Sequence, residues 1–474
     1  MRRRDVLTAA LAVLLALAPG RRPLTAQAVL TPGVAMFATV RAPIVALEHV
    51  RVIDGTGAAA REDQTVLMVD GRIAGVGASG RVPIPRGAQR IDLTGRTVIP
   101  GLVGLHEHLF YPTGNSGSTY TAHPFSFPRM YLAGGVTTAR TGGSFNTRAD
   151  LEVKRAVDMG LVPGPDLLIT AGYMDGPRLS SQGMTAVTTP DEARRFIEDW
   201  AERGVHSFKA YTSIPRAALA EAVKAAHEHG LMVTGHLCSV TFREAAEMGI
   251  DNLEHGFLVA SDWVAGKSVD ECPAGQSSAF DALDIADARV ADLIRLLVSR
   301  RVAITSTLAV TELPEVQQRF RDALAPPTLT AYVNRRQSTL GLGHVTFPDS
   351  RKEVALERAF VQAGGLLVAG ADPTGDGQVL PGFGDQRNIE MLVEGGFTVP
   401  EAIRIATLNG ATLLKLADRI GSIEVGKQAD LVVLDGNPLA RIEDIERIVT
   451  VFKDGIGFDT GRLLDSVKGH VGID

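Results

Sequence analysis

Eight short apolar runs alternate with helix-like stretches between residues 102 and 372, and this alternation most constrains what the chain can fold into. The runs cover residues 102–108, 136–140, 166–171, 205–211, 231–236, 251–255, 302–307 and 366–372. Strands that alternate with helices predict β-α units with parallel strands. Eight such units are typical of a barrel, so we expect a (β/α)8 TIM barrel over residues 99–418.

The segments on either side of the predicted barrel have a different pattern. Residues 45–98 hold short β-rich runs, and Asp70-Gly71 between two of them indicates a hairpin. Residues 419–474 show the same pattern of short β-rich runs. We therefore expect an α/β protein in which 45–98 and 419–474 form the two parts of a small β-sandwich, an organisation that suits 474 residues.

Residues 1–28 predict a signal peptide. A basic start precedes the apolar run Val6–Leu17, and Ala26-Gln27-Ala28 provides a small-x-small cleavage site. The apolar run is too short to span a bilayer, so the mature chain is expected to have no membrane span. Arg3-Arg4 resembles the twin-arginine export motif, and a general secretory signal with a basic start is the alternative. Either route predicts an exported protein, periplasmic or secreted.

The net charge and the two cysteines bear on the binding partners and on disulfide formation. The chain has 54 acidic and 48 basic residues and a net charge of −6, which gives no basic surface for nucleic acid. Export would place Cys238 and Cys272 in an oxidising compartment, where a disulfide can form. The spacing alone leaves open whether these two cysteines pair.

Ionisable side chains stand at or near the C-terminal ends of five of the apolar runs, where barrel enzymes carry their active sites. They are His106, His108, Lys209, His236, His255 and Asp372. His106 and His108 are two residues apart on a strand, so both imidazoles face one side and can share a metal ion. The similar triplet His227-Glu228-His229 ends a predicted helix, and we interpret it as a solvated helix terminus.

The remaining strand-end residues predict a second metal and a bridging group. An isolated ammonium is costly on a buried strand, so Lys209 is interpreted as carboxylated by CO₂ to bridge two cations. A salt bridge and a neutral catalytic amine stay open as alternatives for Lys209. His236 and His255 end successive strands and predict a pair of metal ligands. Asp372 could both bind metal and take a proton from water.

The chain resembles the amidohydrolase superfamily, in the imidazolonepropionase-like branch that includes metal-dependent dipeptidases (prolidases). The resemblance covers residues 45–456. Its motifs are Val98–His108, Gly135–Thr138, Phe208–Tyr211, Gly235-His236, Glu254–Gly256, Gly370–Asp372, Ala406–Ala411 and Gly421–Leu434. Thr141 departs from relatives that often carry Asp after the preceding Arg, which puts a pocket contact there in doubt.

The resemblance implies a binuclear centre with two divalent ions. His106, His108 and Asp372 would hold one ion, His236 and His255 the other, and N6-carboxylysine at Lys209 would bridge them. A bridging hydroxide would attack the carbonyl carbon, and Asp372 would pass a proton to the leaving amine. Zn²⁺ is expected from the ligand types, with Mn²⁺, Co²⁺ or Fe²⁺ open.

These observations predict a metal-dependent hydrolase that cleaves a non-cyclic amide bond of a dipeptide or an N-acyl amino acid. Tyr211, Arg140 and Tyr120 are candidate substrate contacts by position, as is Arg178. A lactonase, esterase or organophosphate hydrolase would use the same site. A deaminase or cyclic amidohydrolase fits Lys209 less well, and a non-enzymatic binding protein is the remaining class. Relatives are commonly oligomeric, so a homo-oligomer is expected.

Overall fold

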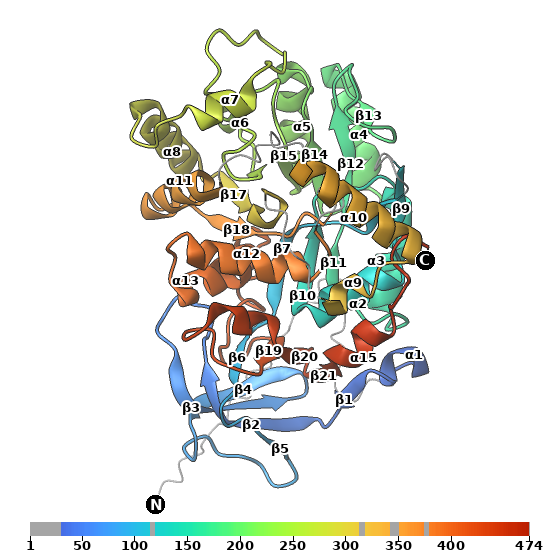
Figure 1. The fold of residues 1–474 in the computed structure, drawn as a ribbon, viewed down its shortest axis with the longest axis vertical. Coiled ribbons are helices and arrows are strands. Elements are labelled where there is room, and N and C mark those ends of the chain that lie inside the picture. Colours follow the sequence, from blue (N-terminus) through green and yellow to red (C-terminus); the bar gives the residue numbers. More distant parts are fainter. Residues whose placement is uncertain (1–29, 114–118, 312–317, 342–349, 374–378, 474) are drawn as a thin grey trace, which may run out of the picture.

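The computed structural model describes residues 30–113, 119–311, 318–341, 350–373 and 379–473 (Figure 1). The predicted signal peptide, residues 1–28, therefore lies outside the described residues. A β-rich part occupies the lower end of the view in Figure 1, and an α/β part stands above it. Within the described ranges, no helix is both long enough and apolar enough to cross a membrane.

The β-rich part is one nine-stranded sheet built from both ends of the described chain. Its order is β1-β21-β20-β19-β6-β2-β3-β4, with β5 paired to β2. The strands are β1 (Ala38–Val40), β2 (Ile44–Val52), β3 (Arg61–Val69), β4 (Arg72–Ala78), β5 (Gln89–Asp92), β6 (Thr97–Pro100), β19 (Leu431–Leu434), β20 (Ile448–Lys453) and β21 (Ile456–Asp459). The strand pairing places them in a single sheet, so the predicted two-layer sandwich is not confirmed.

The hairpin between β3 and β4 is confirmed. Val69 pairs with Arg72, and Asp70 and Gly71 between them have φ values of 47° and 78°. Two positive φ values match a turn whose twist suits antiparallel strands, and Gly71 adopts such a value without strain.

Every one of the eight predicted barrel runs contains a strand. The strands are β7 (Leu102–Glu107), β10 (Val136–Thr141), β11 (Asp166–Leu168) followed by β12 (Thr170–Asp175), β14 (Ser207–Ala210), β15 (Met232–Gly235), β16 (Asn252–Glu254), β17 (Ala303–Ser306) and β18 (Leu367–Ala369). The third run is broken at Ile169 into two strands, which the sequence pattern did not indicate. Pairing is parallel throughout these strands.

The parallel strands form two arcs. One has the order β11-β10-β7, and the other has the order β13-β12-β14-β15-β16-β17-β18, with β13 at Thr185–Ala186. At the third strand, an isolated bridge between Ser144 and Gly172 connects the arcs. At the opposite join, the backbone N–H of Asp372 donates to the carbonyl oxygen of His106 over 2.9 Å. The ends of β7 and β18 are therefore adjacent, although the ladders do not close a complete ring.

Helices follow the strands and cover the outside of the arcs (Figure 1). They include α2 (Ser126–Ala133), α3 (Thr147–Asp158), α4 (Pro190–Ala201), α5 (Arg216–Glu228), α6 (Phe242–Met248), α8 (Ala288–Arg300), α11 (Ser350–Gln362) and α12 (Phe383–Glu394). Helix α5 begins after Pro215 and buries Leu219, Ala222 and Val223. This is the amphipathic pattern that residues 214–229 predict.

Two connections beyond the C-terminal strand ends are long. The hairpin of β8 (Phe110–Thr113) and β9 (Thr119–Ala122) follows β7, and the excursion of residues 257–287, containing α7 (Gln276–Asp281), follows β16. A disulfide between Cys238 and Cys272 ties that excursion to the loop after β15. The described parts of residues 311–360 contain α9 (Gln318–Arg321), α10 (Pro326–Gly341) and most of α11.

Candidate metal centre

His106, His108 and Asp372 form a compact cluster of possible metal ligands. One donor atom from each lies within 4.8 Å of the others, and all three residues are buried. Nε2 of His108 is 3.2 Å from Oδ1 of Asp372, and Nε2 of His106 is 3.7 Å from the same oxygen. These residues come from the ends of β7 and β18. They lie close together because the hydrogen bond from the backbone N–H of Asp372 to His106 holds the two strand ends side by side.

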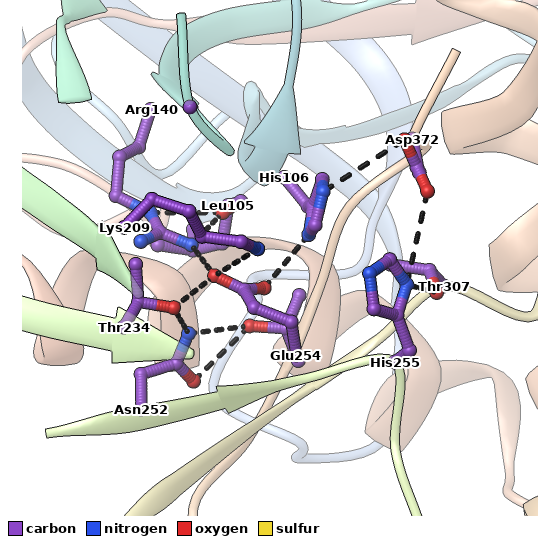
Figure 2. Close-up of polar contacts among 12 residues, drawn as sticks. Leu105, His106, Arg140, Lys209, Thr234, Asn252, Glu254, His255, Thr307 and Asp372 are labelled. Atoms are coloured by element: carbon purple, nitrogen blue, oxygen red, sulfur yellow. Dashed lines mark hydrogen bonds and ion pairs between the residues drawn. The ribbon is translucent and has the colours of Figure 1, made fainter. Parts of the chain in front are cut away.

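His236 and His255 lie beside this cluster. Their ring centroids are 4.5 Å apart, and the ring of His255 is 4.7 Å from the ring of His106. Nδ1 of His255 is 3.7 Å from Oδ2 of Asp372, so Asp372 contacts both His106 and His255 (Figure 2). The structure thus brings together four imidazoles and a carboxylate from strand ends that are far apart in the sequence.

Two of these residues have strained backbone. His255 has φ 64° and Asp372 has φ 45°, values that non-glycine residues rarely adopt. Such conformations cost about 1–3 kcal/mol and persist where surrounding contacts enforce them, most often at functional sites. Nδ1 of His255 is held 2.9 Å from the Thr307 hydroxyl, and Asp372 is held by its backbone hydrogen bond.

Glu254 contacts several residues of the buried polar network next to the cluster (Figure 2). Its Oε2 lies 2.8 Å from Nδ1 of His106, and its Oε1 accepts a hydrogen bond from Arg140 over 2.8 Å. The Thr234 hydroxyl also donates to Oε1. A carboxylate on Nδ1 fixes the tautomer of His106 and leaves Nε2 free to bind a metal.

Lys209 is almost fully buried within the same network. Its Nζ lies 3.7 Å from Oε1 of Glu254 and has no hydrogen-bond partner among the described residues. Burial lowers the pKa of Lys209 to about 8, although the charge of Glu254 opposes this effect. The amine therefore has a substantial neutral fraction near neutral pH.

Glu107 lies between His106 and His108 at the end of β7 and points to the other side of the strand. Its Oε1 accepts a hydrogen bond from the backbone N–H of Ala371 over 3.0 Å. Ala371 precedes Asp372, so Glu107 connects the histidine strand to the segment that carries the carboxylate.

The electrostatics prepare these side chains to bind a cation. Burial lowers the pKa of His236 to about 3 and holds that of His255 well below its usual value, so both imidazoles are neutral. Burial also opposes ionisation of Asp372, but His106, His108 and His255 outweigh it and hold its pKa well below the usual range. Neutral imidazoles beside an ionised carboxylate are the donor set that Zn²⁺ and similar divalent ions prefer.

Three of the four predicted substrate contacts have different positions, and the fourth, Arg178, is exposed. The ring of Tyr211 lies 4.8 Å from the ring of His236, and Tyr120 stacks on Phe145 with centroids 4.6 Å apart. Arg140 is completely buried, and its guanidinium donates to the carbonyl oxygen of Leu105 and to Glu254. These interactions hold the Arg140 side chain in the buried network around Glu254, and its role as a substrate contact stays a prediction.

Sequence reasoning missed the role of Glu254. The signal was an acidic residue inside the buried run Ile250–His255, directly before a strand-end histidine. It also missed Phe110, Phe145 and Tyr173, whose rings lie near the cluster but on separate strands and loops. Nothing in the local sequence shows that these rings meet.

Comparison with known proteins identifies the family. The model of the amidohydrolase family matches residues 97–457. The chain belongs to the amidohydrolase family. It is therefore a metal-dependent hydrolase that acts on carbon–nitrogen bonds.

Individual members of the amidohydrolase family resemble the chain along most of its length. It is 26% identical to imidazolonepropionase of Micrococcus luteus over 398 residues, which cover 79% of this chain and 88% of the relative. A Bifidobacterium longum protein assigned as a prolidase has a TM-score of 0.63 and 24% identity, with 90% of this chain and 98% of that chain covered. A Xaa-Pro dipeptidase with bound methionine has a TM-score of 0.65 and 18% identity, covering 88% and 100%. These amidohydrolase neighbours have the TIM-barrel fold that the sequence predicts.

Proposed function

We propose that this amidohydrolase is an exported binuclear enzyme that cleaves the amide bond of a dipeptide or an N-acyl amino acid. The observation that carries the proposal is the convergence of His106, His108 and Asp372 on one point. His236 and His255 lie beside this cluster, and Lys209 contacts Glu254 next to it. The predicted signal peptide supports export.

The proposed ligand set divides into two halves with a bridge. His106, His108 and Asp372 would hold one divalent ion, and His236 and His255 would hold the other. Carboxylated Lys209 would supply the bridging carboxylate, and two features of its amine support this assignment. The amine has a pKa of about 8, which leaves a reactive neutral fraction, and it has no hydrogen-bond partner among the described residues.

The ions, when bound, would polarise the scissile carbonyl and lower the pKa of water from 15.7 to about 7. Asp372 would act as the general base and acid. Its carboxylate is ionised, buried and held between His108 and His255. It would accept a proton from the attacking water at one carboxylate oxygen and deliver it to the leaving amine nitrogen.

The decisive experiment combines metal analysis with a substrate panel. Purified protein should contain close to two divalent ions per chain, and chelation should abolish hydrolysis until Zn²⁺, Mn²⁺ or Co²⁺ is restored. Dipeptides and N-acyl amino acids should be hydrolysed faster than lactones and phosphotriesters. A single tightly held ion, or faster turnover of lactones or phosphotriesters, would overturn the proposal.

The chain offers a matched control for the histidine ligands. His227 and His229 repeat the spacing of His106 and His108, but they lie at the exposed end of α5, where His227 contacts Asp251 over 3.0 Å. The double variant His106→Asn/His108→Asn should lose one ion and all activity. The double variant His227→Asn/His229→Asn should keep both.

A further inference from the structure

Five aromatic rings form a continuous series along one side of the metal centre. They belong to Phe110, Tyr120, Phe145, Tyr173 and Tyr211, and we call this series the aromatic arc. Phe110 and Tyr120 lie in the hairpin after β7, and Phe145 follows β10. Tyr173 lies in β12, and Tyr211 directly follows β14.

The arc connects one proposed metal ligand to another. Phe110 lies 4.6 Å from the ring of His108, and Phe145 lies 4.7 Å from Phe110. Tyr173 is 5.2 Å from Phe145, and Tyr211 is 5.2 Å from Tyr173. Tyr211 completes the series at 4.8 Å from His236. The rings therefore follow the order of the first four β-α units around the barrel.

The arc lies outside the contiguous core clusters of the described residues. Phe110 and Tyr173 are only 4% and 5% exposed, yet neither ring belongs to a core cluster of the described residues. Tyr120, Phe145 and Tyr211 are half-buried and also stand outside those clusters. Rings that pack on one another beside a metal centre form an apolar lining suited to an apolar ligand.

The backbone is adapted to hold the arc. A Cβ atom on Gly143 would lie 2.5 Å from the ring of Tyr173, and Gly143 has φ 135°. Only glycine fits at this position, for reasons of both space and conformation. The carbonyl oxygen of Gly143 also lies 3.3 Å from Nδ1 of His108. The same turn thus supports an arc ring and a proposed metal ligand.

The side chains of the arc carry no charge. Burial raises the pKa of Tyr173 well above its usual value, and Tyr211 and Asp372 raise it further, so its hydroxyl stays neutral. Arg140, the cation expected nearby, is fully buried and engaged with Glu254. A charged substrate side chain placed against the arc would lose hydration without gaining an opposite charge from it.

We propose that the aromatic arc binds an aromatic or bulky apolar group next to the scissile amide bond of the substrate. The preferred substrates are then N-acyl amino acids or dipeptides with an aromatic residue or an aromatic acyl group on the arc side. This inference rests on the proposed amide hydrolysis. Phe110, Phe145 and Tyr173 become specificity-determining residues, because flat rings recognise a further ring through offset or edge-to-face packing.

The test uses matched substrates and two variants. Acetyl and benzoyl derivatives of Phe, Leu, Lys and Glu vary the acyl group and the side chain independently, and either group can face the arc. The wild type should favour the best aromatic substrate over its Lys and Glu counterparts by at least about tenfold in kcat/KM, since a hydrophobic pocket discriminates at this level. Phe145→Leu and Tyr173→Leu should remove most of this preference and should retain the metal content.

Phe196→Leu is the matched control. Phe196 is also half-buried, but it lies on α4 and packs on Phe208 at 6.3 Å, on the outside of the barrel. This variant should keep the aromatic preference. Phe145→Trp should keep it as well, which separates loss of an aromatic surface from general damage to the fold.

A binding measurement distinguishes failure of this inference from failure of the proposed function. Calorimetry on metal-free protein should show that N-benzoyl-phenylalanine binds more tightly than N-acetyl-glutamate, and that Phe145→Leu weakens only the former. If none of the amides is hydrolysed but this difference persists, the proposed reaction fails and the arc stands. Equal binding of the two compounds, or an aromatic preference unchanged in both leucine variants, would overturn the arc.

Discussion

Nδ1 of His106 lies 2.8 Å from Oε2 of Glu254, although the two residues are 148 positions apart in the sequence. The other oxygen of Glu254 accepts a hydrogen bond from Arg140 and lies 3.7 Å from Nζ of Lys209. Burial opposes ionisation of Glu254, but the charges of Lys209 and Arg140 outweigh it and hold its pKa well below the usual range. One buried carboxylate therefore orients His106 and neutralises Arg140.

The first prediction concerns this positioning role. Glu254→Gln keeps the size of the side chain but removes the charge that fixes the tautomer of His106. Metal affinity should fall by roughly 10- to 100-fold, as is typical when the partner of a ligand is changed. Competitive titration with a chromophoric chelator measures the loss directly. Glu198→Gln on the surface of α4 is the control, and equal metal affinity in the two variants would refute the role of Glu254.

The second prediction concerns Lys209. Protein prepared with ¹³C-labelled bicarbonate should give a carbamate carbon signal in NMR that disappears in Lys209→Ala. The same variant should lose activity and regain part of it with short carboxylates, which can occupy the bridging position. Lys224→Ala is the control, because that side chain is 65% exposed on α5. If the wild-type protein holds two ions but gives no carbamate signal, the prediction is wrong and Lys209 is a buried ion-pair partner of Glu254.

The third prediction concerns pH and a pair of carboxyl groups on α11. Oε1 of Glu353 accepts a hydrogen bond from the backbone N–H of Phe257 over 2.7 Å, and Oε2 of Glu357 accepts one from Ser306 over 3.0 Å. Burial raises the pKa of Glu357 to about 8 and that of Glu353 well above its usual value. The first contact holds the segment that follows His255, and the second holds the end of β17.

The sign of the effect follows from proton linkage. Because the folded protein holds this proton more tightly than the unfolded chain, stability is fully present below the unfolded pKa of 4.5 and is lost as pH rises through about 8. Glu357→Gln should therefore lose less stability than the wild type between about pH 5 and about pH 9. Urea denaturation at a series of pH values measures this, and parallel pH curves for the two proteins would contradict it.

The fourth prediction concerns the disulfide. Cys238 and Cys272 are 34 residues apart, and a closed loop of this length stabilises a fold by about 2–4 kcal/mol relative to the unfolded chain. The free energy of unfolding of the double variant Cys238→Ser/Cys272→Ser should be lower by that amount. The variant should therefore unfold at a lower urea concentration. KM should rise more than kcat falls, because the bond holds the 257–287 excursion near His236 but touches no metal ligand. An unchanged urea midpoint would show that the bond contributes nothing.

The sequence alone determined the eight β-α units, the hairpin at Asp70-Gly71 and the residues that gather at the metal centre. These features are local, because strand periodicity, turn residues and the strand-end position of each histidine can all be recognised within a short window. His106 and His108 illustrate this best, since their spacing on one strand is enough to place both imidazoles on the same side.

Only the tertiary structure decided which distant side chains meet. Arg140 has the sequence position of a substrate contact, but its guanidinium turns beneath the centre because Glu254 from another strand neutralises it there. The rings of the aromatic arc come from four separate β-α units, and the pairing of β1 to β6 with β19 to β21 in one sheet is equally non-local. Periodicity fixes the face on which a side chain lies, whereas its neighbours depend on how strands pack side by side.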